Sequence, residues 1–217
     1  MKWVSYGPRA LLFRFAESVG EEALARQQGI VADLERDPPA GLAEFVPAFT
    51  TILLEFDRKI VPEPERIAAS LARRFQAVVP MSASAGPILE IPVRYDGEDL
   101  AALARGKGLT AGEVVRLHCA PVYRVYMLGF SPGFPYLGDL DPRLHTPRRA
   151  APRTRVAAGA VAIGGQHTGI YTVDGPGGWN VIGHTSVRLF DPEQEGEGMF
   201  RLRAGDRLRF VPDGGSE

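Results

Sequence analysis

The sequence has very little cysteine, a balanced charge and no long apolar run. Cys119 is the only cysteine among 217 residues, which excludes an intramolecular disulfide and fits a reducing compartment. The net charge is -1, with 25 basic and 26 acidic residues, so no broad electrostatic field favours a nucleic acid or an acidic membrane. No apolar stretch approaches the roughly 18 residues of a membrane span, and Arg9 and Arg14 interrupt the N-terminus before any signal-peptide core. We therefore expect a cytoplasmic protein that binds neither nucleic acid nor a membrane.

The sequence also lacks several common catalytic motifs. It contains no G-x-x-x-x-G-K-[ST] phosphate loop, no G-x-G-x-x-G and no H-E-x-x-H, and no G-x-S-x-G nucleophile elbow is expected. The histidines at positions 118, 145, 167 and 184 have no paired metal-ligand spacing, so no metal site is expected. His118 and Cys119 are adjacent, but neighbours on a helix point about 100° apart, and a lone cysteine is more often a small buried hydrophobe. The catalytic residues stay unknown at this level.

The first part of the chain has the pattern of a small α+β domain. Residues 10–15 alternate between apolar and polar, as in a half-buried strand. Ser18 and Glu21 have capping-box spacing and predict a helix that ends near Arg36. Two short strands separated by Pro47 and then a second helix are predicted next, over 42–46, over 50–56 and from Pro62 and Pro64 onward.

The order of these elements predicts a two-layer α+β domain over residues 1–80, completed by a fourth strand from 88–93 or from the chain around residue 78. The small, uncharged segment 81–87 then predicts a linker. A second domain is expected over 88–217.

The second domain begins with helix signals and continues with strand signals. Helices are predicted over about 98–105 and 111–119, the second with a capping box formed by Thr110 and Glu113. Short β-rich segments bounded by Gly, Pro or Asp follow, over 122–128, 160–164, 169–173, 179–183, 186–190 and 207–211. This succession predicts a closed or nearly closed β-barrel.

Glycine and proline are concentrated between Gly129 and Asp191, a run that holds 11 of the 25 glycines. Around aromatic and amide side chains, they indicate a preformed pocket. The loop 164–169 offers an amide, an imidazole and a hydroxyl, and the loop 175–180 offers an indole and an amide. Each loop also has an alternative to a pocket role. The loop 164–169 suits a hairpin whose polar residues face water, and the indole of the loop 175–180 suits a place in the core.

Two further groups of residues are candidates for the same pocket. Phe130, Phe134, Pro135 and Tyr136 suit its apolar wall, although such residues taken alone are more often core. The arginine-rich segment 143–155 suits an anionic ligand, although scattered charges more often face water.

These residues resemble one family. The segment 123–138 (YRVYMLGFSPGFPYLG), the Asp141–His145 step, the Q-x-T-G-I-Y loop ending at Tyr171 and the P-G-G-W sequence ending at Trp179 are similar to the KipI family. Its members are also called the B subunit of 5-oxoprolinase or, in older naming, allophanate hydrolase subunit 1. The similarity covers essentially the whole chain. It implies an α+β N-terminal domain followed by a mainly-β, cyclophilin-like barrel.

The resemblance also implies a function. Family members act as non-autonomous subunits of an ATP-dependent 5-oxoprolinase, an amide hydrolase, together with a KipA-like C subunit and the oxoprolinase A subunit. The complex uses ATP with Mg²⁺, and no cofactor is expected to bind this chain tightly. One relative inhibits a sensor histidine kinase, so regulation is the alternative function and a kinase the alternative partner. A prolyl isomerase follows only from the barrel shape, which does not carry function.

By motif match, nine residues are the candidates for substrate binding: Phe134, Tyr136, Gln166, His167, Thr168, Tyr171, Trp179, Asn180 and His184. Family members often carry glutamine at position 167 and arginine at position 184. Arginine is always charged, whereas histidine is charged only below about pH 6.5, so anion binding at His184 is expected to be altered. The substrate therefore stays open between 5-oxoproline, allophanate and another amide.

Overall fold

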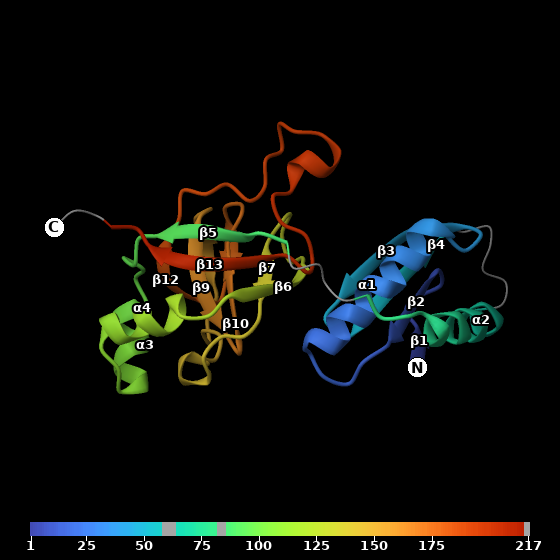
Figure 1. Cartoon of the computed structure of the whole chain (residues 1–217), viewed down its shortest axis with the longest axis horizontal. Helices are drawn as coiled ribbons and strands as arrows, with labels where there is room; N and C mark the ends of the chain where they lie inside the picture. The colour runs from blue at the N-terminus through green and yellow to red at the C-terminus, as the bar shows by residue number, and fades with distance from the viewer. Residues whose placement is uncertain (58–63, 82–85, 215–217) are drawn as a thin grey trace. The chain divides into compact units, whose positions relative to one another are not determined.

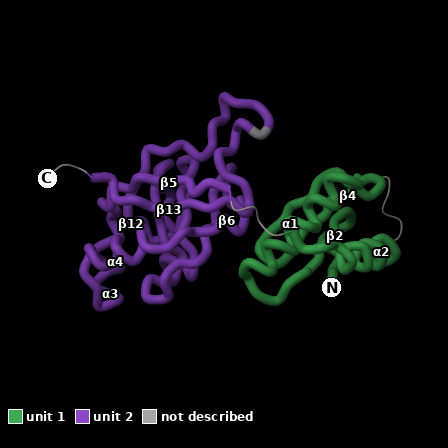
Figure 2. The backbone as a smooth tube through the Cα atoms, in the orientation of Figure 1, with its two compact units in different colours: residues 1–84 green, residues 85–217 purple. Residues whose placement is uncertain are grey.

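The computed structural model describes residues 1–57, 64–81 and 86–214. The chain divides into two compact units, Met1–Ser84 and Ala85–Glu217 (Figure 2). Within the predicted linker 81–87, residues 82–85 lie outside the described residues, as does Pro62. No helix in the described ranges has both the length and the apolar character that crossing a membrane requires.

Unit 1 is the predicted α+β domain. Its elements are β1 (Lys2–Ser5), β2 (Ala10–Arg14), α1 (Glu21–Arg36), β3 (Leu42–Ala48), β4 (Thr51–Phe56) and α2 (Pro64–Ala77). The described strands form an antiparallel sheet in the order β1-β2-β4-β3. Alternate residues of β2 and β4 are buried, and the two helices supply the other half of the core, as in the edge-to-face contact of Phe13 with Phe75 at 5.3 Å.

Three details of unit 1 differ from the sequence prediction. The fourth strand is β1, and the segment 88–93 instead pairs with β13 of unit 2. Gly20 is the N-cap of α1 and no side chain caps the helix, so the Ser18 and Glu21 capping box does not form. Pro47 lies inside β3, which is an edge strand of the sheet, where its missing N–H is tolerated.

Unit 2 is mainly β. Its elements are β5 (Ile88–Val93), α3 (Leu100–Lys107), α4 (Ala111–Cys119), β6 (Tyr123–Leu128), β7 (Pro135–Leu137), η1 (Pro142–Leu144), β8 (Arg153–Val156), β9 (Ala160–Gly164), β10 (His167–Ile170), β11 (Gly175–Gly177), β12 (Asn180–His184), η2 (Gly196–Met199) and β13 (Arg207–Pro212). The predicted strand 186–190 is absent from this described part of the chain, where Phe190 makes only an isolated bridge with Phe200.

The main sheet of unit 2 closes into a barrel. The described strands run in the order β12-β9-β10-β7-β6-β13-β5, with β13 parallel to β5. The two ends of this order meet, because Arg94, just after β5, exchanges main-chain hydrogen bonds of 2.9 and 2.8 Å with His184 of β12. The fold is therefore the predicted α+β domain followed by a mainly-β, cyclophilin-like barrel. A small ribbon of β8 and β11 lies beside the main sheet.

The helices of unit 2 lie together on one side of the barrel (Figure 1). α4 has the predicted capping box, with the Thr110 hydroxyl accepting from the Glu113 N–H and the Glu113 carboxylate accepting from the Thr110 N–H. The segment that carries η2 projects away from the sheet on another side (Figure 1). The barrel interior is filled by apolar side chains, including Val125, Ile163 and Phe210, so a ligand site must lie elsewhere.

Candidate functional site

The outer face of the barrel carries a second apolar cluster, separate from the interior core. Alternate residues of β9 contribute to both, because Val161 and Ile163 belong to the core whereas Ala160 and Ala162 belong to the outer cluster. The outer cluster consists of Phe134, Val156, Ala160, Ala162, Tyr171, Trp179 and Val181, with Tyr136 packed against it. Since the alanine side chains are short, the aromatic rings lie close to the sheet.

A cavity of about 320 Å³ opens on this cluster. It is lined by Phe130, Phe134, Tyr136, Arg148, Arg149, Pro152, Tyr171, Pro176, Gly177, Gly178 and Trp179. The ring centroid of Phe134 lies 5.1 Å from that of Tyr136 and 5.3 Å from those of Tyr171 and Trp179, all in edge-to-face geometry. Such contacts fix the orientation of each ring, so the cavity is preformed.

Two glycines make room for these rings. A Cβ atom added at Gly164 would come within 2.4 Å of the Trp179 indole, and one at Gly177 within 2.3 Å of the Tyr171 hydroxyl. Both distances are far below a normal carbon contact. The glycines predicted to shape a pocket therefore do so by letting aromatic side chains lie directly on the backbone.

Arg148 brings positive charge to the cavity. Its guanidinium carbon lies 5.9 Å from the centroid of the Trp179 ring, a cation–π distance. Burial raises the pKa of Tyr136 and of Tyr171, and the charge of Arg148 acts in the opposite direction on both. The two hydroxyls therefore stay protonated at neutral pH and can donate hydrogen bonds near the guanidinium.

The neighbouring arginines are already paired. The buried Asp99 accepts hydrogen bonds from Arg149 at 2.8 Å and Arg153 at 2.9 Å through Oδ1, and from the Val181 N–H at 2.7 Å through Oδ2. Arg153 also contacts Glu98, with a nitrogen to oxygen distance of 2.7 Å. Two carboxylates thus balance two guanidinium groups beside the cavity.

The structure brings together four of the nine predicted binding residues as lining of this cavity: Phe134, Tyr136, Tyr171 and Trp179. Asn180 lies next to them without lining it. Its side-chain amide donates to the carbonyl groups of Pro147 at 3.0 Å and Ile163 at 3.1 Å. Asn180 therefore ties the loop that precedes Arg148 to the barrel.

The other four predicted residues lie elsewhere in unit 2. Thr168 is buried, Gln166 is exposed in the turn between β9 and β10, and His167 is half-buried, with a pKa that burial lowers. His184 lies at the closure of the barrel, where its Nδ1 is 2.8 Å from the Asp96 carboxylate. None of these side chains lines the aromatic cavity as the described residues form it.

The motif match did not select Phe130, Arg148 or Arg149, which also line the cavity. Phe130 has a backbone φ of 72° and is 64% exposed, and its ring centroid lies 5.6 Å from that of Phe134. From the sequence, Phe130 could be identified as a pocket residue by its place among glycines and prolines. Arg148 and Arg149 were harder to identify, because nothing in the basic segment 143–155 distinguishes a side chain that faces a cavity from those that face water.

The segment Gly129–Gly133 reads G-x-S-x-G, a spacing that sequence reasoning missed and that nucleophile elbows share. Its structural context is different, because it connects the antiparallel strands β6 and β7 and does not lead from a strand into a helix. The positive φ belongs to Phe130, and the Ser131 hydroxyl lies 3.4 Å from that of Thr172. The arrangement is a tight hairpin loop and lacks the base of a catalytic serine.

His118 and Cys119 are also joined in a structural network. Tyr95 links them, with its hydroxyl 2.7 Å from His118 Nδ1 and 3.1 Å from the Cys119 sulfur. The opposite ring nitrogen of His118 contacts the buried Thr168 hydroxyl at 2.8 Å, and that hydroxyl donates to the Ala162 carbonyl. Burial lowers the pKa of His118 to about 3 and raises that of Cys119.

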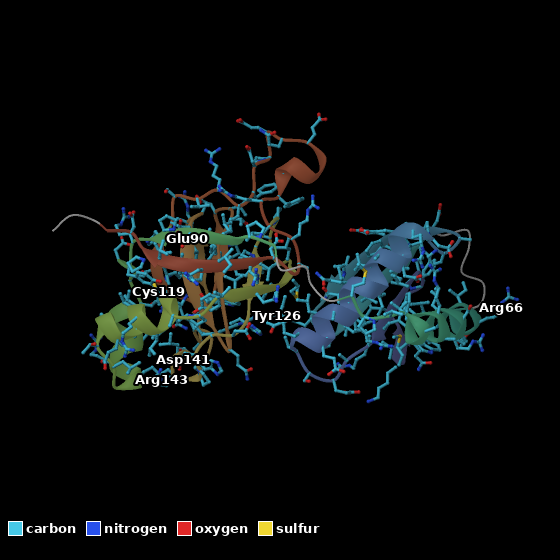
Figure 3. All side chains as sticks on the ribbon, viewed as in Figure 1. Arg66, Glu90, Cys119, Tyr126, Asp141 and Arg143 are labelled. Carbon is cyan, nitrogen blue, oxygen red and sulfur yellow. The ribbon has the colours of Figure 1, made fainter. Side chains whose placement is uncertain are left out.

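This network holds α4 against the barrel and supplies no nucleophile. Cys119 lies in unit 2 where α4 meets the barrel (Figure 3). Since its thiol stays protonated at neutral pH and His118 stays neutral, the pair lacks the thiolate that attacks substrates. The sequence interpretation of Cys119 as structural agrees with this environment.

The cavity can bind and orient a ligand, but its lining holds no group that suits covalent or acid–base chemistry at neutral pH. Among the described residues, the lining includes no carboxylate, imidazole or thiol. Its two tyrosine hydroxyls have raised pKa values, so they stay protonated and can donate hydrogen bonds to a ligand. The site therefore has the composition of a recognition site.

Comparison with known proteins gives a consistent family. Residues 1–200 match the family model described as carboxyltransferase domain, subdomain C and D. The chain is 45% identical over 177 residues to the 5-oxoprolinase B subunit of Escherichia coli O157:H7, covering 79% of this chain and 78% of that protein. It is 36% identical over 217 residues to the 5-oxoprolinase B subunit of Bacillus subtilis strain 168, covering 94% of this chain and 90% of that protein.

Solved structures give the same result for the fold. The crystal structure of TTHA0988 in space group P212121 is 44% identical in sequence, with a TM-score of 0.81 over 96% of this chain. The match covers 41% of that chain, so this chain spans less than half of the solved relative.

Proposed function

The chain belongs to the carboxyltransferase subdomain C and D family, as a member of the KipI group that provides the B subunit of 5-oxoprolinase, and from this premise we propose that it is a non-autonomous subunit of an ATP-dependent 5-oxoprolinase-type amide hydrolase. The observation that carries the proposal is the 45% identity to a 5-oxoprolinase B subunit over 78% of that protein's length. The proposed partners are a KipA-like C subunit and an oxoprolinase A subunit.

The cavity is the proposed contribution of this chain to the substrate site. A five-membered lactam ring combines a planar amide with apolar CH and CH₂ groups, and these groups suit packing on the wall that Phe134 and Trp179 form. The hydroxyls of Tyr136 and Tyr171 are protonated donors that suit the lactam carbonyl oxygen. Because the lining, as the described residues form it, lacks a base and a nucleophile, we propose that the reacting groups come from another chain. This composition favours a subunit over a self-sufficient enzyme.

The residues of this cavity do not fit ATP. A triphosphate with Mg²⁺ needs a glycine-rich loop with a lysine, or a comparable set of cations and carboxylates, and the sequence contains no phosphate loop. The cavity offers Arg148 and the Asp99-bound Arg149, and no carboxylate for a metal ion. We therefore propose that ATP is bound by the partner subunits, and we derive no step through it on this chain.

Reconstitution tests the proposal. The chain is combined with the oxoprolinase A and KipA-like C subunits from the same genome, and 5-oxoproline-dependent ATP hydrolysis and glutamate formation are measured with and without it. We expect turnover only when all three are present. The variant Trp179→Ala should lower turnover strongly, whereas Trp3→Phe in unit 1 serves as the matched control and should leave it unchanged. Equal turnover in the absence of this chain would refute the proposal.

A further inference from the structure

The arginines around the aromatic cavity differ in one respect. Arg149 and Arg153 are bound to Asp99, and Arg155 is bound to Asp174 at 2.6 Å. Arg148 has no carboxylate within ion-pair distance in the described part of the chain. Its guanidinium carbon lies 5.9 Å from the centroid of the Trp179 ring. It is thus the uncompensated cation of the cavity lining as the described residues form it.

The main chain on both sides of Arg148 is fixed. The Pro147 carbonyl accepts a hydrogen bond from the Asn180 side chain at 3.0 Å, and the Arg149 N–H donates to the Gly178 carbonyl at 2.7 Å. The Arg148 residue between these two anchors is exposed. The main chain therefore holds Arg148 at the cavity mouth, while its exposed side chain retains rotamer freedom. This combination suits a group that closes on a ligand.

We propose that the cavity recognises a small cyclic monocarboxylate, whose carboxylate binds Arg148 and whose ring packs on the aromatic wall that Phe134 and Trp179 form together. A guanidinium donates two parallel hydrogen bonds to one carboxylate, and a single uncompensated cation matches a single negative charge. The cavity volume of about 320 Å³ suits a small ligand. An uncharged peptide segment would fill the aromatic wall but leave Arg148 without a partner. The inference deepens the proposed function, on which it rests for the choice of probes.

Binding to the full-length chain alone provides the test. In a Trp3→Phe background, Trp179 is the only remaining tryptophan, so its fluorescence reports the cavity. The probes are 5-oxoproline, 2-pyrrolidinone, which has the same lactam ring without the carboxylate, and a proline peptide capped at both ends. Dissociation constants are measured for the parent, for Arg148→Gln and Arg148→Lys, and for Arg155→Gln as the matched control from the same arginine-rich segment.

We expect the parent to bind 5-oxoproline about 10-fold to 100-fold more tightly than 2-pyrrolidinone, the range for a charge-assisted hydrogen-bonded pair. Arg148→Gln should remove this preference, Arg148→Lys should keep part of it, and Arg155→Gln should keep all of it. Equal affinity for both lactams in the parent overturns the proposal. So does a preference that survives in Arg148→Gln, tightest binding by the capped peptide, or no saturable response to any probe.

The outcome is separable from that of the proposed function. An Arg148-dependent preference for the carboxylate, in a chain whose omission leaves the reconstituted turnover unchanged, would retain this inference and refute the proposed function. Turnover that requires the chain but is insensitive to Arg148→Gln in both kcat and KM would refute this inference alone.

Discussion

Replacing Asp99 with asparagine tests how the cavity is supported. The Asp99 side chain is 9% exposed and accepts three hydrogen bonds, two from guanidinium groups and one from the Val181 N–H. Asparagine has nearly the same shape, but it loses the charge and replaces one carboxylate oxygen with a donor. At least one of the three donors then faces another donor, and Glu98 becomes the remaining carboxylate partner of Arg153, whose side chain is 17% exposed.

The expected loss is large because the buried Asp99 loses its charge and the half-buried Arg153 loses a carboxylate partner, whereas the more exposed Arg149 adds little. Removing one member of a buried ion pair typically costs about 3–5 kcal/mol, and the remaining amide oxygen places Asp99→Asn near the lower end, at about 3 kcal/mol. Against a typical domain stability of about 5–15 kcal/mol, unit 2 should stay folded at 25 °C. Its melting temperature should fall by roughly 10 °C.

Urea unfolding followed by Trp179 fluorescence in the Trp3→Phe background measures the stability of unit 2. The matched control is Glu98→Gln, which removes the neighbouring carboxylate from the same Arg153. The Glu98 side chain is 63% exposed, so its loss should cost about 0–1 kcal/mol. If Asp99→Asn unfolds at the same urea concentration as Glu98→Gln, the cavity does not depend on a buried charge network.

Three further results are expected. Gly164→Ala should displace the Trp179 indole, which lies 2.4 Å from the added Cβ, lowering stability by about 1–3 kcal/mol and changing the near-ultraviolet circular dichroism of the indole. Phe130→Gly should weaken binding of 5-oxoproline. It should also be about 1 kcal/mol more stable than Phe130→Ala in urea unfolding, because a positive φ strains alanine but not glycine. Burial lowers the pKa of His118 to about 3, and an unfolded histidine titrates near about 6.5, so its contribution to stability is present above pH 6.5 and is lost as the pH falls toward 3. Between pH 6.5 and 5 the parent should lose up to about 1.4 kcal/mol per pH unit, and His118→Gln should have a smaller slope in urea unfolding.

The sequence predicts local structure well where the signal is local. The Thr110 and Glu113 capping box forms because both partners lie within one turn of α4. Strand pairing is a different matter. The alternation of residues 88–93 identifies a strand, but its partner β13 lies more than a hundred residues away, and only the packed barrel selects it. The same limit explains why β1 was not recognised as the fourth strand of unit 1.

The candidate site divides in the same way. Aromatic residues next to glycines and prolines were identified as pocket residues, and Phe134, Tyr136, Tyr171 and Trp179 do line one cavity. The polar candidates depended on side-chain direction, which alternates along a strand and is set by register. Thr168 faces the interior, where it contacts His118 at 2.8 Å, whereas Gln166 is exposed and His167 is half-buried.

The closed barrel places the cavity on an outer face, which agrees with the proposed role as a subunit. Apolar side chains fill the interior, so a ligand can bind only on an outer face, where the glycine at position 164 gives the Trp179 indole room to lie flat. A site on an outer face is open to solvent on one side, and the exposed ring of Phe130 marks its rim. In the proposed complex, a partner that covers this face would both exclude water and supply the reacting groups. The cavity has aromatic walls and a cation but no base in its described lining. It would therefore bind and orient the substrate in the proposed complex, while the partner would supply the reacting groups.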